Sequence, residues 1–343
     1  MASALSVAIV GCGNRSVEHM NAVDAVAGLE IASGADAQEA GRARFAERYD
    51  APVFDKFANL LAASVPDVAA ICTMEYPRYE LTMQAIKAGV RAIVLEKPMA
   101  RTVMEAREMV AAAESRGNHL IVCHQMRFSD EFVSAKWALD RSAIGTPYLY
   151  RATSFGHLME QGPHMVDMVL WLAGDPEVEW VMGQIADVES GRSTVHPAPA
   201  FVLGYVTFVN GARAIFECGR SFQRAVELPD QTWLQKRVQV LGTDGMIDSI
   251  VAHHCKIMSP SQGNWKTLAE GAASWNRATD AFYEELRDVI YDGGVHRNNG
   301  AASLRGFEII HSIYAAALAR DRIAVSPDFD ATALERIMTL GRT

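Results

Sequence analysis

The feature that most constrains the fold is an apolar run, Leu5–Val10, that leads through the hexapeptide GCGNRS into a helical pattern. In such a strand–turn–helix unit, Gly11 permits the tight turn and Gly13 lets backbone N–H groups approach a pyrophosphate. The N-terminus of the next helix adds partial positive charge. A glycine-rich turn without a ligand is the alternative. The residues expected to bind a dinucleotide here are Gly11, Gly13, Asn14 and Arg15.

Strand-like apolar runs alternate with helical patterns over the first third of the chain. One helix is expected over 102–116, because Thr102 and Glu105 match a capping box and Gly117 ends the pattern. Such alternation predicts a doubly wound parallel sheet, a Rossmann domain over residues 1–123. The further strands are expected at Leu29–Gly34, Val68–Thr73, Ala92–Leu95 and Leu120–Cys123, with another helix at Tyr79–Ala88.

The pattern changes after about residue 145. Asn210-Gly211 lies between two β-rich runs, 201–209 and 212–219, and Asp244-Gly245 separates two more. These dipeptides are strong hairpin signals, so long antiparallel strands are indicated. Helical patterns at 275–291 and 302–320 follow. We therefore expect residues 124–343 to form an α+β domain with a large, mostly antiparallel sheet, which binds substrate and mediates oligomerisation.

Asp36 ends the second strand, roughly 20 residues after Gly13, where a carboxylate accepts hydrogen bonds from the adenosine ribose and repels a 2′-phosphate. The next two residues, Ala37 and Gln38, carry no positive charge. NAD is therefore favoured over NADP, although Arg42 and Arg44 lie further along. A helix-capping role is the alternative for Asp36.

The bulk composition excludes several other classes of protein. The 343 residues carry a formal net charge of −9, which argues against nucleic acid or anionic membrane as the main partner. The five cysteines form no CxxC pair, so reduced thiols in the cytoplasm are expected rather than disulfides or a metal site. The apolar start of the chain is interpreted as a strand rather than a signal peptide, and no run is long enough for a membrane span.

Glu96-Lys97-Pro98 follows the fourth predicted strand, at the edge of the sheet where ligands of doubly wound folds bind. This motif, the run 68–73, the run 85–90, and GPHMVD at 162–167 followed by WLAG at 171–174 resemble the Gfo/Idh/MocA oxidoreductases. The resemblance covers nearly the whole chain. It implies an NAD(P)-dependent dehydrogenase or reductase that acts on a secondary alcohol or ketone of a sugar, a sugar derivative or a cyclitol.

The resemblance implies that Lys97 is catalytic and lies near the nicotinamide, with Thr73 and Glu96 among the cofactor residues. A lysine in water is protonated at neutral pH, but burial and the charge of oxidised nicotinamide both lower a lysine pKa. Lys97 would then accept the hydroxyl proton while hydride leaves the carbon. A surface salt bridge with Glu96 is the alternative.

In the second domain, Gly162 and Pro163 are interpreted as the N-cap and first residue of a largely apolar helix. His164 and Asp167 share one face, and a polar stripe on a buried helix must be hydrogen-bonded or face a cavity. His164 is expected to relay a proton and, like Asp167, to bind substrate. A core histidine with satisfied hydrogen bonds is the alternative.

Two positions depart from the family pattern, and one site assignment has an open alternative. Glu160 stands where relatives carry Asp, four residues before His164, and remains a catalytic candidate. Tyr79 stands where many members carry histidine. Arg127 is a candidate for substrate binding or for a structural ion pair.

Two other functions are alternatives. A relative that oxidises a glycoside transiently would use the same lysine and histidine and give net cleavage without net NADH. A non-catalytic regulator would bind cofactor only, and the presence of Lys97 disfavours it. Family analogy implies a homodimer or homotetramer.

Overall fold

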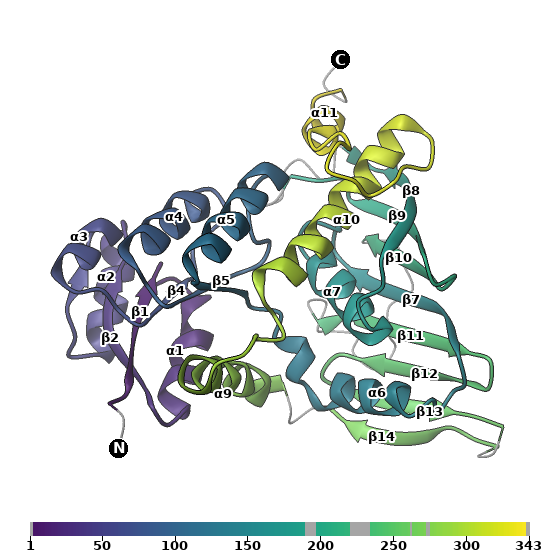
Figure 1. The fold of residues 1–343 in the computed structure, drawn as a ribbon, viewed down its shortest axis with the longest axis horizontal. Helices are drawn as coiled ribbons and strands as arrows, with labels where there is room; N and C mark the ends of the chain where they lie inside the picture. The colour runs from purple at the N-terminus through teal and green to yellow at the C-terminus, as the bar shows by residue number, and fades with distance from the viewer. Residues whose placement is uncertain (1–2, 189–196, 220–233, 261–262, 272–274, 341–343) are drawn as a thin grey trace. The chain divides into compact units, whose positions relative to one another are not determined.

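The computed structural model (Figure 1) divides into two units, and the divisions fall within three of its helical elements. The first unit comprises residues 1–125 and 276–304, and the second comprises residues 126–275 and 305–343. The structure describes residues 3–188, 197–219, 234–260, 263–271 and 275–340.

The first unit is built on a six-stranded parallel sheet in the order β3-β2-β1-β4-β5-β6. Its inner strands β4 and β5 are buried along their whole length, which is why they are continuous apolar runs in the sequence. Parallel strands require crossover helices, and these follow almost every strand. The strands are β1 (Leu5–Val10), β2 (Leu29–Ala35), β3 (Val53–Phe54), β4 (Val68–Ile71), β5 (Ala92–Leu95) and β6 (His119–Val122).

The helices of the first unit lie on both sides of this sheet, with α4 and α5 on one side and α1 and α9 on the other (Figure 1). The capping box predicted for α5 is confirmed: Thr102 accepts from the Glu105 N–H, and Glu105 accepts from the Thr102 N–H. The helices are α1 (Ser16–Ala25), α2 (Glu39–Arg48), α3 (Phe57–Ala63), α4 (Arg78–Ala88), α5 (Val103–Arg116) and α9 (Trp275–Asp292).

The predicted Rossmann fold is confirmed, and five of its six strands lie within two residues of their expected bounds. β3 was not predicted, because two residues are too few to show a period. The structural division comes two residues after the expected boundary at 123. The return of residues 276–304 to the first unit was also not predicted, because no local signal marks it.

The second unit is built on an eight-stranded sheet in the order β14-β13-β12-β11-β7-β10-β9-β8. Both predicted hairpins are confirmed, and Gly211 in the first turn has φ +84°, which favours glycine. The sheet is antiparallel except where β7 and β10 pair in parallel. The strands are β7 (Pro147–Phe155), β8 (Val178–Ala186), β9 (Phe201–Phe208), β10 (Arg213–Gly219), β11 (Lys236–Gly242), β12 (Gly245–Ile250), β13 (His254–Met258) and β14 (Lys266–Glu270).

Helices cover one face of the eight-stranded sheet. A Cβ on Gly183 would come within 2.1 Å of the Ile313 carbonyl oxygen, so β8 and α10 approach at backbone distance. Along β9 and β10, buried residues alternate with partly exposed ones, so the opposite face stays partly exposed. The remaining helical elements are η1 (Gln125–Phe128), α6 (Asp130–Asp140), α7 (Gly162–Ala173), α10 (Gly300–Ala319) and α11 (Ala333–Leu340). Over the described part of the chain, each helix is too short or too polar to cross a bilayer.

Candidate active site

The turn after β1 has the geometry of a phosphate-binding loop. Gly11 has φ +85°, and a Cβ there would lie 2.8 Å from the Thr73 side chain, so only glycine fits. A Cβ on Gly13 would meet open space, which leaves this backbone accessible to a pyrophosphate at the start of α1. Ser16 is buried and donates to the Gly13 carbonyl oxygen at 2.7 Å, which ties the start of α1 to the loop.

Asp36 lies directly after β2 and is tied to the same loop. Its carboxylate accepts from the Cys12 N–H at 2.7 Å and from the Gln38 N–H at 2.8 Å. A Cβ on Gly41 would come within 2.3 Å of this carboxylate, so α2 begins close against it. Arg42 donates to the carbonyl oxygens of Asp36 and Ala37, which brings a guanidinium near this strand end. The loop, the helix N-terminus and the carboxylate together fit a nicotinamide dinucleotide.

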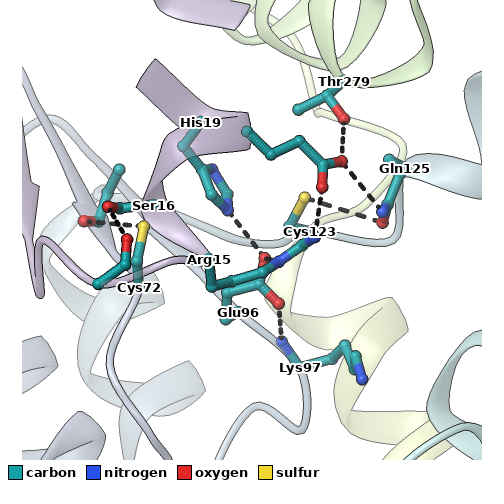
Figure 2. Close-up of polar contacts among 12 residues, drawn as sticks. Arg15, Ser16, His19, Cys72, Glu96, Lys97, Cys123, Gln125 and Thr279 are labelled. Carbon is teal, nitrogen blue, oxygen red and sulfur yellow. Dashed lines mark hydrogen bonds and ion pairs between the residues drawn. The ribbon is translucent and has the colours of Figure 1, made fainter. Parts of the chain in front are cut away.

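Glu96, directly after β5, is the centre of a buried ion network (Figure 2). Its Oε1 accepts from Arg15 Nε at 2.5 Å and lies 2.8 Å from His19 Nε2. Arg15 therefore joins the phosphate loop to the strand end that carries Lys97. The Lys97 side chain is half-buried and extends away from the Glu96 carboxylate, while its N–H donates to Glu96 Oε2 at 3.3 Å.

Residues from distant parts of the chain complete this network, and the sequence did not predict them. Tyr283 on α9 places its hydroxyl 2.8 Å from His19 Nδ1, although 264 positions separate the two residues. Glu18 forms an ion pair with Arg15 and accepts from the Thr279 hydroxyl at 2.7 Å. No local pattern could have found Tyr283 and Thr279, because both come from the segment that returns to the first unit.

The network fixes the charges beside Lys97. Burial raises the pKa of Glu96, but the Arg15 charge and the His19 hydrogen bond outweigh burial and hold it well below its usual range. Burial lowers the pKa of His19, yet the nearby Cys72 and Glu96 outweigh that effect and raise it to about 10. Glu96 is therefore ionised at neutral pH, with its charge balanced by Arg15 and His19.

Ligand atoms of His19, Glu96 and Cys123 lie within 4.8 Å of one another, a spacing that a metal ion could use. The Arg15 guanidinium already contacts the same Glu96 oxygen. A second cation there would be repelled by Arg15 at close range. The arrangement therefore has the chemistry of an ion pair rather than of a metal centre.

The first two residues of α4, Arg78 and Tyr79, lie in very different surroundings. Tyr79 lies on the outer side of α4, and its hydroxyl donates to Glu108 on α5 at 2.6 Å. Arg78 is 2% exposed, and its guanidinium donates to the carbonyl oxygens of Thr73 and Pro98. The substitution that we noted at Tyr79 is therefore on the surface, whereas the neighbouring arginine reaches the strand ends.

The second-unit candidates lie on and around α7. The helix begins at Gly162 with Gln161 as N-cap, one residue earlier than expected, and Gly174 ends it with φ +81°. His164 is buried in the first turn of this helix. The carboxylate of Asp167 accepts two bonds from Arg127, at 2.7 and 2.9 Å, with both side chains buried. This pairing favours the structural alternative for Arg127.

Glu160 lies in the turn before α7, and its side chain is 44% exposed. Its Oε2 is 3.5 Å from Nε2 of His157, a buried histidine that the sequence analysis missed. His157 and Glu160 are three residues apart in the sequence, and this spacing could have identified His157 as a partner of Glu160. Glu160 is thus coupled to an imidazole within its own unit.

Comparisons with known proteins agree with this geometry. Residues 5–124 match the family model described as oxidoreductase family, NAD-binding Rossmann fold, and residues 130–248 match the GFO/IDH/MocA C-terminal domain. D-apiose dehydrogenase of Paraburkholderia graminis is 25% identical over 340 residues, covering 90% of this chain and 87% of that protein. Inositol 2-dehydrogenase 1 of Saccharopolyspora erythraea is 30% identical over 147 residues, covering 42% of this chain and 43% of that protein.

Solved structures show the same fold. An oxidoreductase of Agrobacterium radiobacter, in complex with NAD⁺, L-tartaric acid and magnesium, superposes with a TM-score of 0.83 at 19% identity. The superposition covers 94% of this chain and 99% of that one. The fold and the site therefore define a nicotinamide-dinucleotide-dependent oxidoreductase. The chain belongs to the Gfo/Idh/MocA family, as the EKP and GPHMVD segments indicated.

Proposed function

We propose that the enzyme uses NAD to oxidise a secondary alcohol of a sugar, a sugar derivative or a cyclitol, with Lys97 as the acid–base residue. The observation that carries the proposal is the position of Lys97. It follows β5 directly, beside an ion network that ties this strand end to the phosphate loop. The named relatives include dehydrogenases of apiose, a glucoside and inositol, which supports the polyhydroxylated substrate class.

NAD⁺, held by the phosphate loop and Asp36, would supply the oxidant for the carbinol carbon. Neutral Lys97 accepts the hydroxyl proton at Nζ as the C–O bond gains double-bond character. In the reverse direction, the protonated Nζ donates a hydrogen bond to the carbonyl oxygen and returns the proton. The ionised Glu96 lies one residue away and keeps its charge paired with Arg15 and His19, so Nζ extends away from a satisfied carboxylate.

His164 and Glu160 are proposed as the second-unit participants, His164 relaying a proton and contacting substrate, and Glu160 acting with His157. Arg127 and Asp167 remain weaker substrate candidates, because each already binds the other. The residues proposed to bind the cofactor are Gly11, Gly13, Asn14, Arg15, Asp36, Thr73, Glu96 and Lys97.

NAD is proposed over NADP because of Asp36. Its carboxylate is held at the end of β2 by two backbone N–H groups, and a carboxylate at this strand end would repel a 2′-phosphate. Arg42 is engaged with the carbonyl oxygens of residues 36 and 37. Its guanidinium would favour NADP, as would that of Arg44, which donates to the Cys12 carbonyl oxygen.

A panel of sugars, cyclitols and glycosides, each with NAD and with NADP, tests the reaction by the appearance of NADH. We expect net NADH from at least one sugar or cyclitol. Glycoside cleavage without net NADH would instead identify the transient-oxidation mechanism. Cofactor binding with neither product would identify a regulator.

Replacing Lys97 by alanine tests its role directly. We expect Lys97→Ala to lower turnover by about 10²–10⁴-fold, the usual contribution of a positioned acid–base group, while NAD affinity changes only a few-fold. Turnover is measured by NADH formation and affinity by fluorescence titration. Lys87→Ala, at an exposed position on α4, is the matched control. Near-normal turnover of Lys97→Ala would reject the acid–base role.

A homo-oligomer is also proposed, on the partly exposed face of the eight-stranded sheet. Met182 and Leu203 are 48% and 36% exposed on neighbouring strands, and Trp180 stacks on Tyr205 with ring centroids 5.6 Å apart. All four line a groove of about 1050 Å³. Exposed apolar surface of this kind favours an interface between protomers. The molar mass measured by light scattering should be that of a dimer or tetramer. The substitution Leu203→Asp should shift the oligomer toward monomer.

A cytoplasmic location is proposed from the cysteines. All five are free thiols in the structure, and four of them are buried. Proteins with this usage are typical of reducing compartments. Cell fractionation followed by immunoblotting would locate the protein, and recovery outside the cytoplasmic fraction would contradict the proposal.

A further inference from the structure

Arg78 joins the two strand ends that border the proposed nicotinamide site. It is the first residue of α4 and is 2% exposed. One terminal nitrogen donates to the Pro98 carbonyl oxygen, and the other donates to the Thr73 carbonyl oxygen. Thr73 lies two residues after β4, and Pro98 lies three residues after β5. A single guanidinium therefore spans two loops that are separate in the sequence.

The energetics of this arginine are unfavourable for the helix that carries it. A positive charge in the first turn is repelled by the helix dipole, and a buried guanidinium loses its hydration. Burial lowers the pKa of Arg78 to about 10, with Glu96 and Glu75 opposing the shift, so the side chain stays charged at neutral pH. The compensating interactions are the two charge-assisted bonds to carbonyl oxygens.

Both of these carbonyl groups adjoin residues of the cofactor site. The Thr73 methyl group lies 2.8 Å from where a Gly11 Cβ would be, so its position sets the clearance of the phosphate loop. Pro98 follows Lys97 directly. Because each carbonyl belongs to the backbone, movement of either one moves the neighbouring side chain with it.

We propose that Arg78 is a positioning residue, whose guanidinium holds the Thr73 and Pro98 carbonyl groups together and thereby places Lys97 for proton transfer. The inference rests on the proposed role of Lys97. A lysine cannot replace this arginine, because an ammonium is a point donor whereas the guanidinium presents its N–H groups in a planar fork. A misplacement of about 1 Å costs on the order of a hundredfold in rate.

The first test removes the guanidinium and returns it from solution. We expect Arg78→Ala to lower kcat on the best substrate of the panel by about a hundredfold, with NAD affinity changed only a few-fold. Guanidinium chloride below its denaturing range should restore at least a tenth of the lost activity, while potassium chloride at equal ionic strength should not. Arg116→Ala, at an exposed position on α5, is the control and should behave as wild type in both salts.

The second test follows Lys97 without any substrate. The NAD-bound enzyme is acetylated with trace acetic anhydride across a pH series, and Lys97 labelling is read by mass spectrometry. Arg78→Lys keeps the charge but not the fork, so we expect the midpoint of its Lys97 labelling curve to move upward as Nζ becomes more hydrated. Arg78→Ala should show the same shift, reversed by guanidinium.

Two results would overturn the positioning role: wild-type kcat with an unshifted labelling curve in Arg78→Lys, or an Arg78→Ala defect that guanidinium does not relieve in folded protein. If Arg78→Ala does not fold, Arg78→Lys decides alone. Failure of the proposed function is separable, because Lys97→Ala would then retain turnover. If Lys97→Ala is inactive and Arg78→Lys is wild type, only the positioning proposal fails.

Discussion

The two units use buried charge for different purposes. In the first unit, Arg15, His19 and Glu96 gather at the carboxyl ends of parallel strands, where the phosphate loop also lies. In the second unit, Arg127 and Asp167 pair between η1 and α7. Ligands of doubly wound sheets bind at the carboxyl ends of the strands, so the difference teaches that position relative to those ends, and not burial alone, decides from which buried charges we expect ligand chemistry.

The largest expected effect concerns the pair in the second unit. Asp167→Asn leaves the buried Arg127 charge without its counterion, so we expect a loss of about 3–5 kcal/mol in unfolding free energy, measured by urea titration. The double variant Arg127→Met with Asp167→Leu should recover most of that loss. Asp140→Asn breaks the exposed pair with Lys136 and should cost about 1 kcal/mol or less. An unchanged urea midpoint with a raised KM would make Asp167 a substrate ligand instead.

A second prediction compares the pH responses of the two units. Burial lowers the pKa of His311 on α10 to about 4, from an unfolded value of about 6.5. As the pH falls, His311 therefore becomes protonated in the unfolded chain at a higher pH than in the folded protein. The stability contribution is complete above pH 6.5 and declines by about 3 kcal/mol as the pH falls to about 4.

The variant His311→Leu should remove that part of the pH dependence, as measured by urea unfolding at several pH values. His119→Gln in the first unit is the control. His119 is only half-buried, so burial and Arg91 lower its pKa less strongly, and its removal should flatten the profile less. Equal profiles for wild type and His311→Leu would contradict the assignment.

The smallest expected effect concerns the cofactor side of the first unit. Asp36→Ala removes a charged acceptor for the ribose, so NAD affinity should fall about tenfold and the NADP-to-NAD preference should rise. Fluorescence titration with both cofactors measures the change. Glu39→Ala, at an exposed position on α2, should leave both affinities unchanged. Tighter NADP than NAD binding in the wild type would assign the decisive contact to Arg42 rather than Asp36.

The sequence predicted the elements that depend on local pattern. β1, β4 and β5 are continuous apolar runs because both faces of a parallel sheet are covered. β7 and β8 were not predicted individually, because long strands with one partly exposed face carry mixed polar residues. The contact between His19 and Tyr283 was not predicted for a different reason, because it joins two helices that are far apart in the chain.

The sequence by itself therefore determined the fold class, the phosphate loop, Asp36 and the EKP segment, because each is encoded by neighbouring residues. Only the tertiary structure decided which charges surround Glu96, that Arg127 binds Asp167, and that Arg78 rather than Tyr79 reaches the strand ends. The physical reason is that the pattern of apolar residues along a helix or strand indicates only which face of that element is buried. The partner that a buried charge meets depends on how elements far apart in the chain pack together.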